Sequence, residues 1–266
     1  MSVLTFRGGT HPYDGKILSR DAAIEEIKPG EELVFPLSQH IGAPAVPIVE
    51  IGERVLAGQK IAAKSGFISA NIHSSVSGTV IKIEPRTIAT GGKVNSIVIR
   101  NDNLYEQAPP INDKNPDDMT DDEIRTVIEE AGIVGMGGAG FPTNVKLTPK
   151  NPEVIDTIIV NGAECEPYLT SDYRRMLEYT DELVKGLKIV LRLFPGARGV
   201  FGVEDNKPEA IKALKKATSG ENNIEVAVLK TKYPQGGERC MIKAVTGREI
   251  NSKMLPADAG CIVHNI

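Results

Sequence analysis

A polar stretch rich in proline, residues 106–119, divides this sequence into two parts that follow different patterns. Before it, residues 30–100 alternate short apolar pieces with turn-forming Gly and Ser, a spacing typical of a compact all-β module. After it, helical patterns alternate with short buried-strand patterns, which favours a parallel sheet. We therefore expect two domains of different class joined by a linker.

The second part predicts an α/β domain with a Rossmann-like parallel sheet, preceded by the small all-β domain. Thr120 and Glu123 have the spacing of a capping box at a helix start, and Gly132 is placed to end that helix. We assign residues 1–105 to the β domain, 106–119 to the linker and 120–266 to the α/β domain. The later elements expected are strands at 156–160, 199–203 and 224–229, one long helix from Ser171 to Phe194, a helix over 206–218 with Asn206 as N-cap, and a helix over 237–245.

Composition excludes several classes of function. The formal charge of −4, the 5% of aromatic residues and the absence of Trp argue against a nucleic-acid-binding protein. Cys165, Cys240 and Cys261 are too far apart for a CxxC pair, so we expect reduced thiols in a cytoplasmic protein and no metal or iron–sulfur site. The N-terminus lacks a signal peptide, and no apolar run approaches the ~18 residues that cross a bilayer, so no membrane insertion is expected.

A glycine-rich segment, GIVGMGGAGFPTNVKL, follows the first helix of the second part. Gly135, Gly137 and Gly140 fit the pattern G-x-G-x-x-G, but a helix precedes them where a dinucleotide fingerprint needs a strand. Glycine amides at a helix start hold phosphate well, with Thr143 placed to cap that helix and Lys146 to reach the phosphate. The alternative is a glycine-rich turn beside a solvated Lys146.

An acidic loop, VNGAECEP, follows the strand expected at 156–160. Ligands of open α/β sheets bind at the carboxyl ends of the strands. Asn161 offers both donors and acceptors, while Glu164 and Glu166 flank Cys165 and can accept from ribose hydroxyls or an amide. The alternative is an acidic surface loop; a metal site is disfavoured because no histidine lies nearby.

A third loop, KYPQGGERC, follows the strand expected at 224–229. Gly236 and Gly237 give the backbone freedom just before a helix, and Glu238 falls in the first turn, where the helix dipole favours a negative charge. Tyr233 is suited to lie over a flat ring. Although an ordinary loop is the alternative, the three loops together predict a crevice for a flat cofactor that carries phosphate.

The β domain resembles the lipoyl/biotinyl barrel-sandwich hammerhead in residues 49–62 and 73–83. Those carrier domains need a modifiable lysine at a hairpin tip. Here that position falls near Phe67, and Lys64 is out of register. We therefore expect the fold of a carrier domain without an attached group.

Five motifs together resemble the C subunit of the Rnf complex, a membrane-associated ferredoxin–NAD oxidoreductase. They are LTFRGGTHP, GMGGAGFPTNVKL, VNGAECEPYLTSDYR, YPQGGE and AVTGREI with LPADAGCIVHNI, and they span essentially the whole chain. The α/β part is also similar to the flavin subunit of respiratory complex I. The resemblance implies FMN as cofactor and NADH as hydride partner. It also implies a β-grasp domain and a [4Fe–4S] ferredoxin domain beyond residue 266, so we expect this chain to be truncated.

The resemblance implies site residues but no catalytic acid or base and no metal ligand. Phe141 and Glu166 face the nicotinamide nucleotide. Three departures from the complex I family, Ala163, Cys165 and Gly237, predict weaker flavin and NADH contacts. The residues implied to contact FMN are Gly135, Gly137, Gly138, Gly140, Lys146, Asn161, Glu164, Cys165, Tyr233, Gly236, Gly237, Glu238 and Asn265.

The function implied is that of an electron-transfer subunit, peripheral to the cytoplasmic side of the cell membrane. It takes hydride from NADH onto FMN and passes electrons to iron–sulfur clusters outside this chain, serving ferredoxin indirectly. Its partners are the other subunits of the membrane complex and no nucleic acid. The alternative is a non-catalytic docking subunit of an electron-transfer complex.

Overall fold

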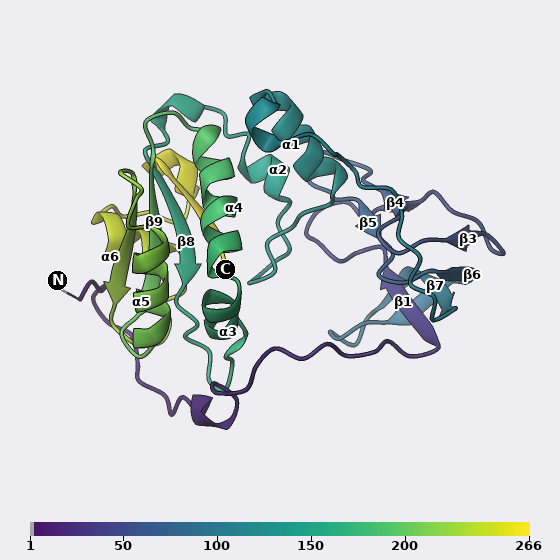
Figure 1. The fold of residues 1–266 in the computed structure, drawn as a ribbon, viewed down its shortest axis with the longest axis horizontal. Coiled ribbons are helices and arrows are strands. Elements are labelled where there is room, and N and C mark those ends of the chain that lie inside the picture. The colour runs from purple at the N-terminus through teal and green to yellow at the C-terminus, as the bar shows by residue number, and fades with distance from the viewer. Residues whose placement is uncertain (1–2) are drawn as a thin grey trace. The chain divides into compact units, whose positions relative to one another are not determined.

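The computed structural model describes residues 3–266 and forms two compact units (Figure 1). The α/β unit contains the N-terminal residues up to Glu25 and residues 149–266, and the β-rich unit contains residues 26–148. The N-terminal arm (residues 3–20) therefore folds with the α/β unit, and the glycine-rich segment (residues 132–147) folds with the β-rich unit. The domain boundaries expected at 105 and 119 stay a prediction.

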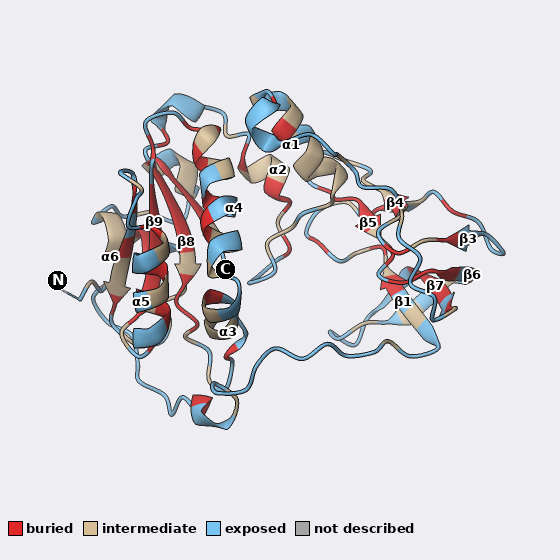
Figure 2. Ribbon diagram, in the orientation of Figure 1, coloured by how far each residue is buried: buried red, intermediate tan, exposed pale blue. Residues whose placement is uncertain are grey.

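The α/β unit is built on a parallel sheet with the strand order β10-β9-β8-β11. The two central strands, β8 and β9, are almost fully buried (Figure 2), as is usual for parallel strands covered on both faces. The register places Asn161 of β8 beside Asn265 of β11. The strands are β8 (Thr157–Gly162), β9 (Arg198–Glu204), β10 (Ile224–Leu229) and β11 (Cys261–Asn265).

Four helices accompany this sheet, and the expectation of one long helix from Ser171 to Phe194 is wrong. The chain leaves helical geometry at Tyr179, where φ is −128° and ψ is 35°. Each piece still buries its own apolar stripe, Met176 in the first and Leu187 in the second. The helices are α3 (Ser171–Glu178), α4 (Thr180–Arg192), α5 (Pro208–Ala217) and α6 (Glu238–Thr246), with 3₁₀ turns at Lys16–Leu18, Pro152–Val154 and Pro256–Ala259.

Asn206 is not the N-cap of α5, contrary to the prediction. The helix begins at Pro208, in the first-turn position that suits proline, and the N-cap residue is Lys207. The Asn206 side chain instead accepts a hydrogen bond of 3.3 Å from Nζ of Lys207.

The β-rich unit confirms the all-β expectation for residues 30–100. Its larger sheet has the antiparallel order β1-β7-β6-β3, and its smaller sheet the order β2-β4-β5. Val55, Ile61 and Ile97 are fully buried in the core of this unit. The strands are β1 (Glu32–Pro36), β2 (Val46–Pro47), β3 (Arg54–Val55), β4 (Lys60–Ala63), β5 (Ile72–His73), β6 (Gly78–Thr87) and β7 (Lys93–Asn101).

The remaining elements of the β-rich unit are α1 (Asp121–Glu130), α2 (Thr143–Lys146) and a 3₁₀ turn at Pro116–Asp118. The capping box of Thr120 and Glu123 is confirmed at the start of α1. Thr143 does not cap α2: Pro142 is the N-cap residue, and Thr143 is the first helical residue, nearly buried.

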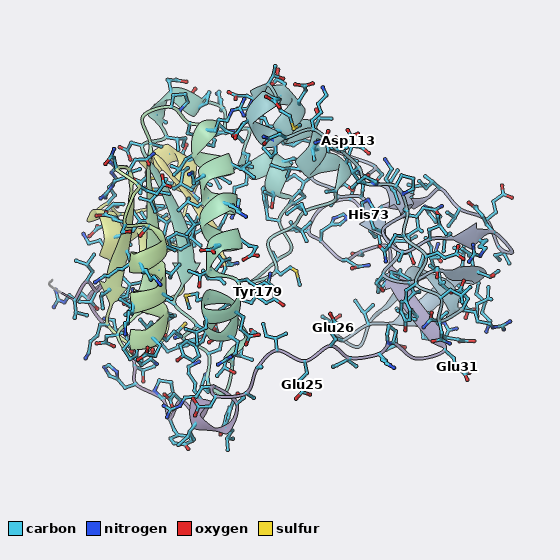
Figure 3. All side chains as sticks on the ribbon, viewed as in Figure 1. Glu25, Glu26, Glu31, His73, Asp113 and Tyr179 are labelled. Carbon is cyan, nitrogen blue, oxygen red and sulfur yellow. The ribbon has the colours of Figure 1, made fainter. Side chains whose placement is uncertain are left out.

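The first of the two chain connections between the units, around residues 23–31, has no regular structure. Glu25, Glu26 and Glu31 lie along this stretch ahead of β1 (Figure 3). Across residues 3–266, no helix combines the length and the apolar character that a membrane span requires.

Candidate functional site

Three segments of the α/β unit meet at the carboxyl ends of its parallel strands. Nδ2 of Asn161, in β8, donates to the carbonyl oxygen of Gly236 at 2.9 Å and to Oδ1 of Asn265 at 3.3 Å. Oδ1 of Asn161 accepts from the backbone N–H of Ala163 at 3.1 Å. One amide group thus ties together the loop after β8, the loop after β10 and the end of β11.

The loops after β8 and β10 approach each other closely at Gly236. A Cβ atom there would lie 2.3 Å from the carbonyl oxygen of Ala163 and 3.4 Å from Sγ of Cys165. No larger residue fits at this position unless the backbone moves. Cys165 is half-buried, and burial raises the pKa of its thiol, which is therefore protonated at neutral pH.

Several of the predicted residues are open to solvent around this contact. Glu166, Tyr233, Glu238 and Asn265 are exposed. Glu238 lies in the first turn of α6, as predicted, and Gly237 is the N-cap residue of that helix. Exposed polar and aromatic side chains thus surround a contact that is itself tightly packed.

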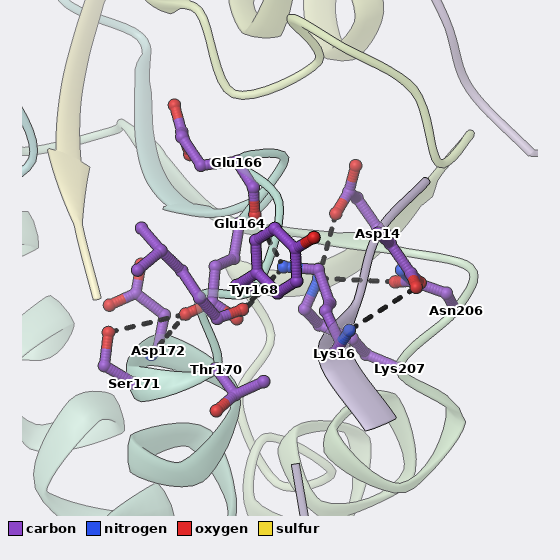
Figure 4. A network of polar contacts seen from close by, with 12 residues as sticks. Asp14, Lys16, Glu164, Glu166, Tyr168, Thr170, Ser171, Asp172, Asn206 and Lys207 are labelled. Atoms are coloured by element: carbon purple, nitrogen blue, oxygen red, sulfur yellow. Dashed lines mark hydrogen bonds and ion pairs between the residues drawn. The ribbon is translucent and has the colours of Figure 1, made fainter. Parts of the chain in front are cut away.

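Glu164 is buried, with 3% of its surface exposed, so an acidic surface loop does not describe it. Its Oε1 accepts from the backbone N–H of Asp172 at 2.8 Å and from Oγ of Ser171 at 3.4 Å, at the start of α3 (Figure 4). A carboxylate in this position caps the helix and is favoured by the helix dipole. Its Oε2 lies 3.9 Å from Nζ of Lys16 and has no hydrogen-bond partner in the described part of the chain.

The surroundings of Glu164 shift the pKa of two neighbouring groups. Burial, followed by the charge of Glu164, raises the pKa of Asp172 to about 6. Burial, together with the charge of Lys207, lowers the pKa of Lys16. The loop after β8 therefore rests on a buried polar network that involves the N-terminal arm and α5.

Sequence reasoning missed four buried polar residues of the α/β unit: Lys16, Glu204, Lys207 and Gln235. Glu204 and Lys207 form a buried ion pair of 2.8 Å, with 0% and 3% of their side-chain surfaces exposed. Gln235 is fully buried, and neither of its amide atoms has a hydrogen-bond partner within residues 3–266. A usable signal for Glu204 was a charge directly after the apolar strand pattern GVFGV.

The glycine-rich segment of the β-rich unit forms a closed loop. The N–H of Gly135 donates to the carbonyl oxygen of Phe141 at 2.9 Å. Within the described chain, no atom lies within 4 Å of a Cβ built at Gly138, and the Met136 side chain is 92% exposed. Gly140 has a φ of +66° and packs its backbone closely against Gln39 and His40.

The predicted FMN and NADH residues are therefore divided between the units. Residues in the α/β unit are Asn161, Glu164, Cys165, Glu166, Tyr233, Gly236, Gly237, Glu238 and Asn265; residues in the β-rich unit are Gly135, Gly137, Gly138, Gly140, Phe141 and Lys146. No group of three or more His, Cys, Asp or Glu side chains suited to a metal ion occurs within residues 3–266.

Comparison with known families assigns both parts of the chain. Residues 128–266 match the Nuo51 FMN-binding domain, and residues 4–104 match the RnfC barrel-sandwich hybrid domain. These matches agree with the parallel sheet and the antiparallel β sheets described above.

Curated relatives are similar over almost the whole chain. The C subunit of the Na⁺-translocating ferredoxin:NAD⁺ oxidoreductase complex of Acetobacterium woodii is 45% identical, over 98% of this chain and 59% of its own length. The proton-translocating counterpart of Clostridium ljungdahlii is 45% identical over 98% and 57%. The C subunit of the ion-translocating oxidoreductase complex of Rhodobacter capsulatus is 41% identical over 100% and 52%.

This chain thus spans between half and three-fifths of the length of these relatives. A solved NAD⁺-reducing [NiFe]-hydrogenase aligns with 55% of this chain and 28% of its own, at 24% identity and a TM-score of 0.47, which is too low to support an argument. The chain belongs to the family of the Nuo51 FMN-binding domain, and its homologues are C subunits of Rnf-type ion-translocating oxidoreductase complexes.

Proposed function

We propose that the α/β unit binds FMN at the carboxyl ends of β8, β10 and β11, and that the chain accepts electrons there from NADH. The observation that carries this proposal is the hydrogen bonding of Asn161, whose Nδ2 donates to Gly236 and to Asn265. Carboxyl ends of parallel strands are where open α/β sheets bind ligands. The membership of residues 128–266 in an FMN-binding family supports FMN as the ligand.

The residues at this position fit a flavin nucleotide. Because Gly236 lacks a Cβ, the carbonyl of Ala163 and the thiol of Cys165 form a closely packed floor. Exposed Tyr233 and Asn265 stand beside it, one with a flat ring and the other with an amide that can donate and accept. A planar heterocycle with polar edges needs this combination of a packed floor and directed polar groups.

The chain's own residues bind and orient, and none is proposed as a proton donor or acceptor. FMN, when bound, supplies the chemistry that accepts a hydride and releases single electrons. Asn161 joins the loops after β8 and β10 through its hydrogen bonds, and Glu164 accepts a hydrogen bond from the start of α3. The neutral thiol of Cys165 adds no charge to the floor. Exposed Glu166 and, from the sequence alone, Phe141 remain predicted contacts of the nicotinamide nucleotide.

The other assignments also rest on the family. We propose a Rossmann-like sheet in the α/β unit and a lipoyl-like fold without an attached group in the β-rich unit. Gly135, Gly137, Gly138, Gly140 and Lys146 remain predicted FMN contacts from the sequence. We place the chain at the cytoplasmic face of the membrane, passing electrons to [4Fe–4S] clusters outside residues 3–266 and, through other subunits, to ferredoxin.

A flavin titration tests this proposal. Purified chain is added to FMN while flavin fluorescence is followed, and NADH is then added without oxygen. We expect saturable quenching, followed by bleaching of the flavin absorbance. Binding without bleaching would contradict the NADH assignment. The absence of quenching would contradict the flavin assignment and favour the docking alternative.

A further inference from the structure

The N-terminal arm, residues 3–20, contains the motif LTFRGGTHP, whose role the flavin site does not explain. This arm contacts the rest of the α/β unit at several separate points. Leu4 pairs with the end of β10, since its N–H donates to the carbonyl of Val228 and its carbonyl accepts from Lys230. Thr10 and Tyr233 exchange two backbone hydrogen bonds of 2.8 Å. The arm is thus tied directly to the loop after β10.

The same arm is tied to the loop after β8. The N–H of Tyr168 donates to the carbonyl of Asp14, and the hydroxyl groups of Ser19 and Thr170 are hydrogen-bonded at 2.8 Å. One segment therefore contacts both loops that contribute to the proposed flavin site.

Two buried lysines stabilise these contacts, one on the arm and one in the loop after β10. Lys16, on the arm, is 8% exposed, and its Nζ donates to the carbonyl oxygens of Glu166 and Leu169 (Figure 4). Lys232, in the loop after β10, is also 8% exposed, and its Nζ donates to the carbonyl of Phe6 at 2.5 Å and lies 3.8 Å from the Phe6 ring centroid. A lysine is rarely buried unless its ammonium is well partnered, so these contacts hold the arm firmly.

Two glycines of the arm allow the close approach. Gly9 has a φ of +92°, and a Cβ there would lie 2.9 Å from the carbonyl oxygen of Tyr233. Gly15 has a φ of +60°, and a Cβ there would lie 2.3 Å from the ring of Tyr168. Both positions combine left-handed backbone geometry with a tight contact to a loop, which only glycine accommodates without strain.

We propose that the N-terminal arm is a strap that sets the relative position of the loops after β8 and β10, with Lys16 and Lys232 as positioning residues for the flavin. This inference rests on the proposed function. Lys16 acts through the carbonyls of Glu166 and Leu169 and through its ion pair with Glu164, whereas Lys232 acts through Phe6 and Gly8. Neither lysine is assigned a contact with the cofactor.

Hydrogen–deuterium exchange of the whole chain without flavin tests the strap directly. In Lys16→Met we expect faster exchange confined to residues 163–170, and in Lys232→Met to residues 4–10 and 232–237. Lys212→Met, at an exposed position of α5, is the matched control and should leave both loops unchanged. Because Lys16→Met risks misfolding, Gly15→Ala provides a second variant, which strains the left-handed backbone at Gly15, displaces the arm or the Tyr168 ring and keeps both lysines.

Flavin binding is the second readout. Each strap variant should bind FMN on the order of tenfold more weakly than wild type and Lys212→Met. Any of three results would overturn the strap. The first is unchanged exchange in both loops, and the second is exchange raised evenly over β8, β9 and β10. The third is unchanged FMN affinity in a variant whose loops exchange faster. If wild type itself fails to bind FMN, the proposed function and the role of the two lysines toward the flavin fail, whereas the exchange measurement still tests whether the strap holds the loops, because it needs no flavin.

Discussion

The loop after β10 and the glycine-rich segment after α1 both contain a pair of adjacent glycines, yet the space around these glycines differs. At Gly236, an added Cβ would lie 2.3 Å from the carbonyl oxygen of Ala163. At Gly138, no atom of residues 3–266 lies within 4 Å of such a Cβ. Glycine serves close packing in the first loop and leaves open backbone in the second, so the same sequence signal has two physical meanings.

The substitution Gly236→Ala should have the largest effect, because it forces apart the two loops of the proposed site. We expect FMN affinity to fall by more than tenfold and the free energy of unfolding to fall by about 1–3 kcal/mol, as for overpacking. Fluorescence titration and denaturant unfolding measure the two effects. The control is Gly186→Ala, at an open position within α4, which should not weaken FMN binding. Equal FMN affinities and equal free energies of unfolding in Gly236→Ala and Gly186→Ala would contradict the close packing at Gly236.

Asn161→Ala removes the side chain that joins three segments. We expect FMN affinity to fall by roughly tenfold, since the two lost hydrogen bonds of its amide donor contribute about 0.7 kcal/mol each. The same titration measures the effect, with Asn223→Ala at an exposed position of the α/β unit as control. Wild-type affinity in Asn161→Ala would show that the segments hold their positions without this side chain.

Asp172→Asn tests the half-buried carboxyl group of Asp172, which lies beside buried Glu164. The folded-state pKa of Asp172, about 6, lies above its ordinary value of 3.8, so the folded state retains a proton that the unfolded state releases between these values. Its contribution to stability therefore falls as pH rises from about 4 to 6. We expect Asp172→Asn to flatten this dependence and to raise the free energy of unfolding at pH 7 by on the order of 1 kcal/mol.

Urea unfolding across this pH range measures the Asp172 effect. Asp181→Asn, in the first turn of α4, is the matched control because it changes an exposed carboxylate at an equivalent helix position. A wild-type pH dependence that survives in Asp172→Asn would mean that another group titrates there.

Gly138→Ala should have the smallest effect on folding. Its Cβ meets open space, so we expect the free energy of unfolding to change by less than about 1 kcal/mol. Gly140→Ala, two residues away, should destabilise more, because Gly140 has a φ of +66° and its Cβ would meet the carbonyl of Gln39 at 2.9 Å. Thermal unfolding measures the stability of both variants. A larger loss of stability in Gly138→Ala than in Gly140→Ala would contradict the open space around Gly138.

Local signals in the sequence predicted an element correctly where a single local pattern determined it. The capping box at Thr120 and the strand at 224–229 followed directly from such signals. The break at Tyr179 was not predictable, because the apolar spacing of the two helices runs on almost without interruption. The N-cap at Asn206 failed because the buried ammonium of Lys207 uses its side chain.

The contact between the loops after β8 and β10 was predictable from the sequence, but its details were not. The loops after β8 and β10 were identified from their position behind buried strands, and Asn161 does join them. Lys16 was not predictable, because its partners Glu166 and Leu169 lie about 150 residues away in the sequence. The burial of Gln235 likewise depends on packing that no local pattern in YPQGGE encodes.

Hydrogen–deuterium exchange with and without FMN tests the central claim most directly, because it locates the flavin on the chain. We predict that saturating FMN slows exchange in three segments of the α/β unit: residues 161–166, 233–238 and 261–266. Adenosine monophosphate, which carries phosphate but no flavin ring, is the control ligand and should not protect these segments. Saturating FMN that leaves all three segments unprotected would contradict the account.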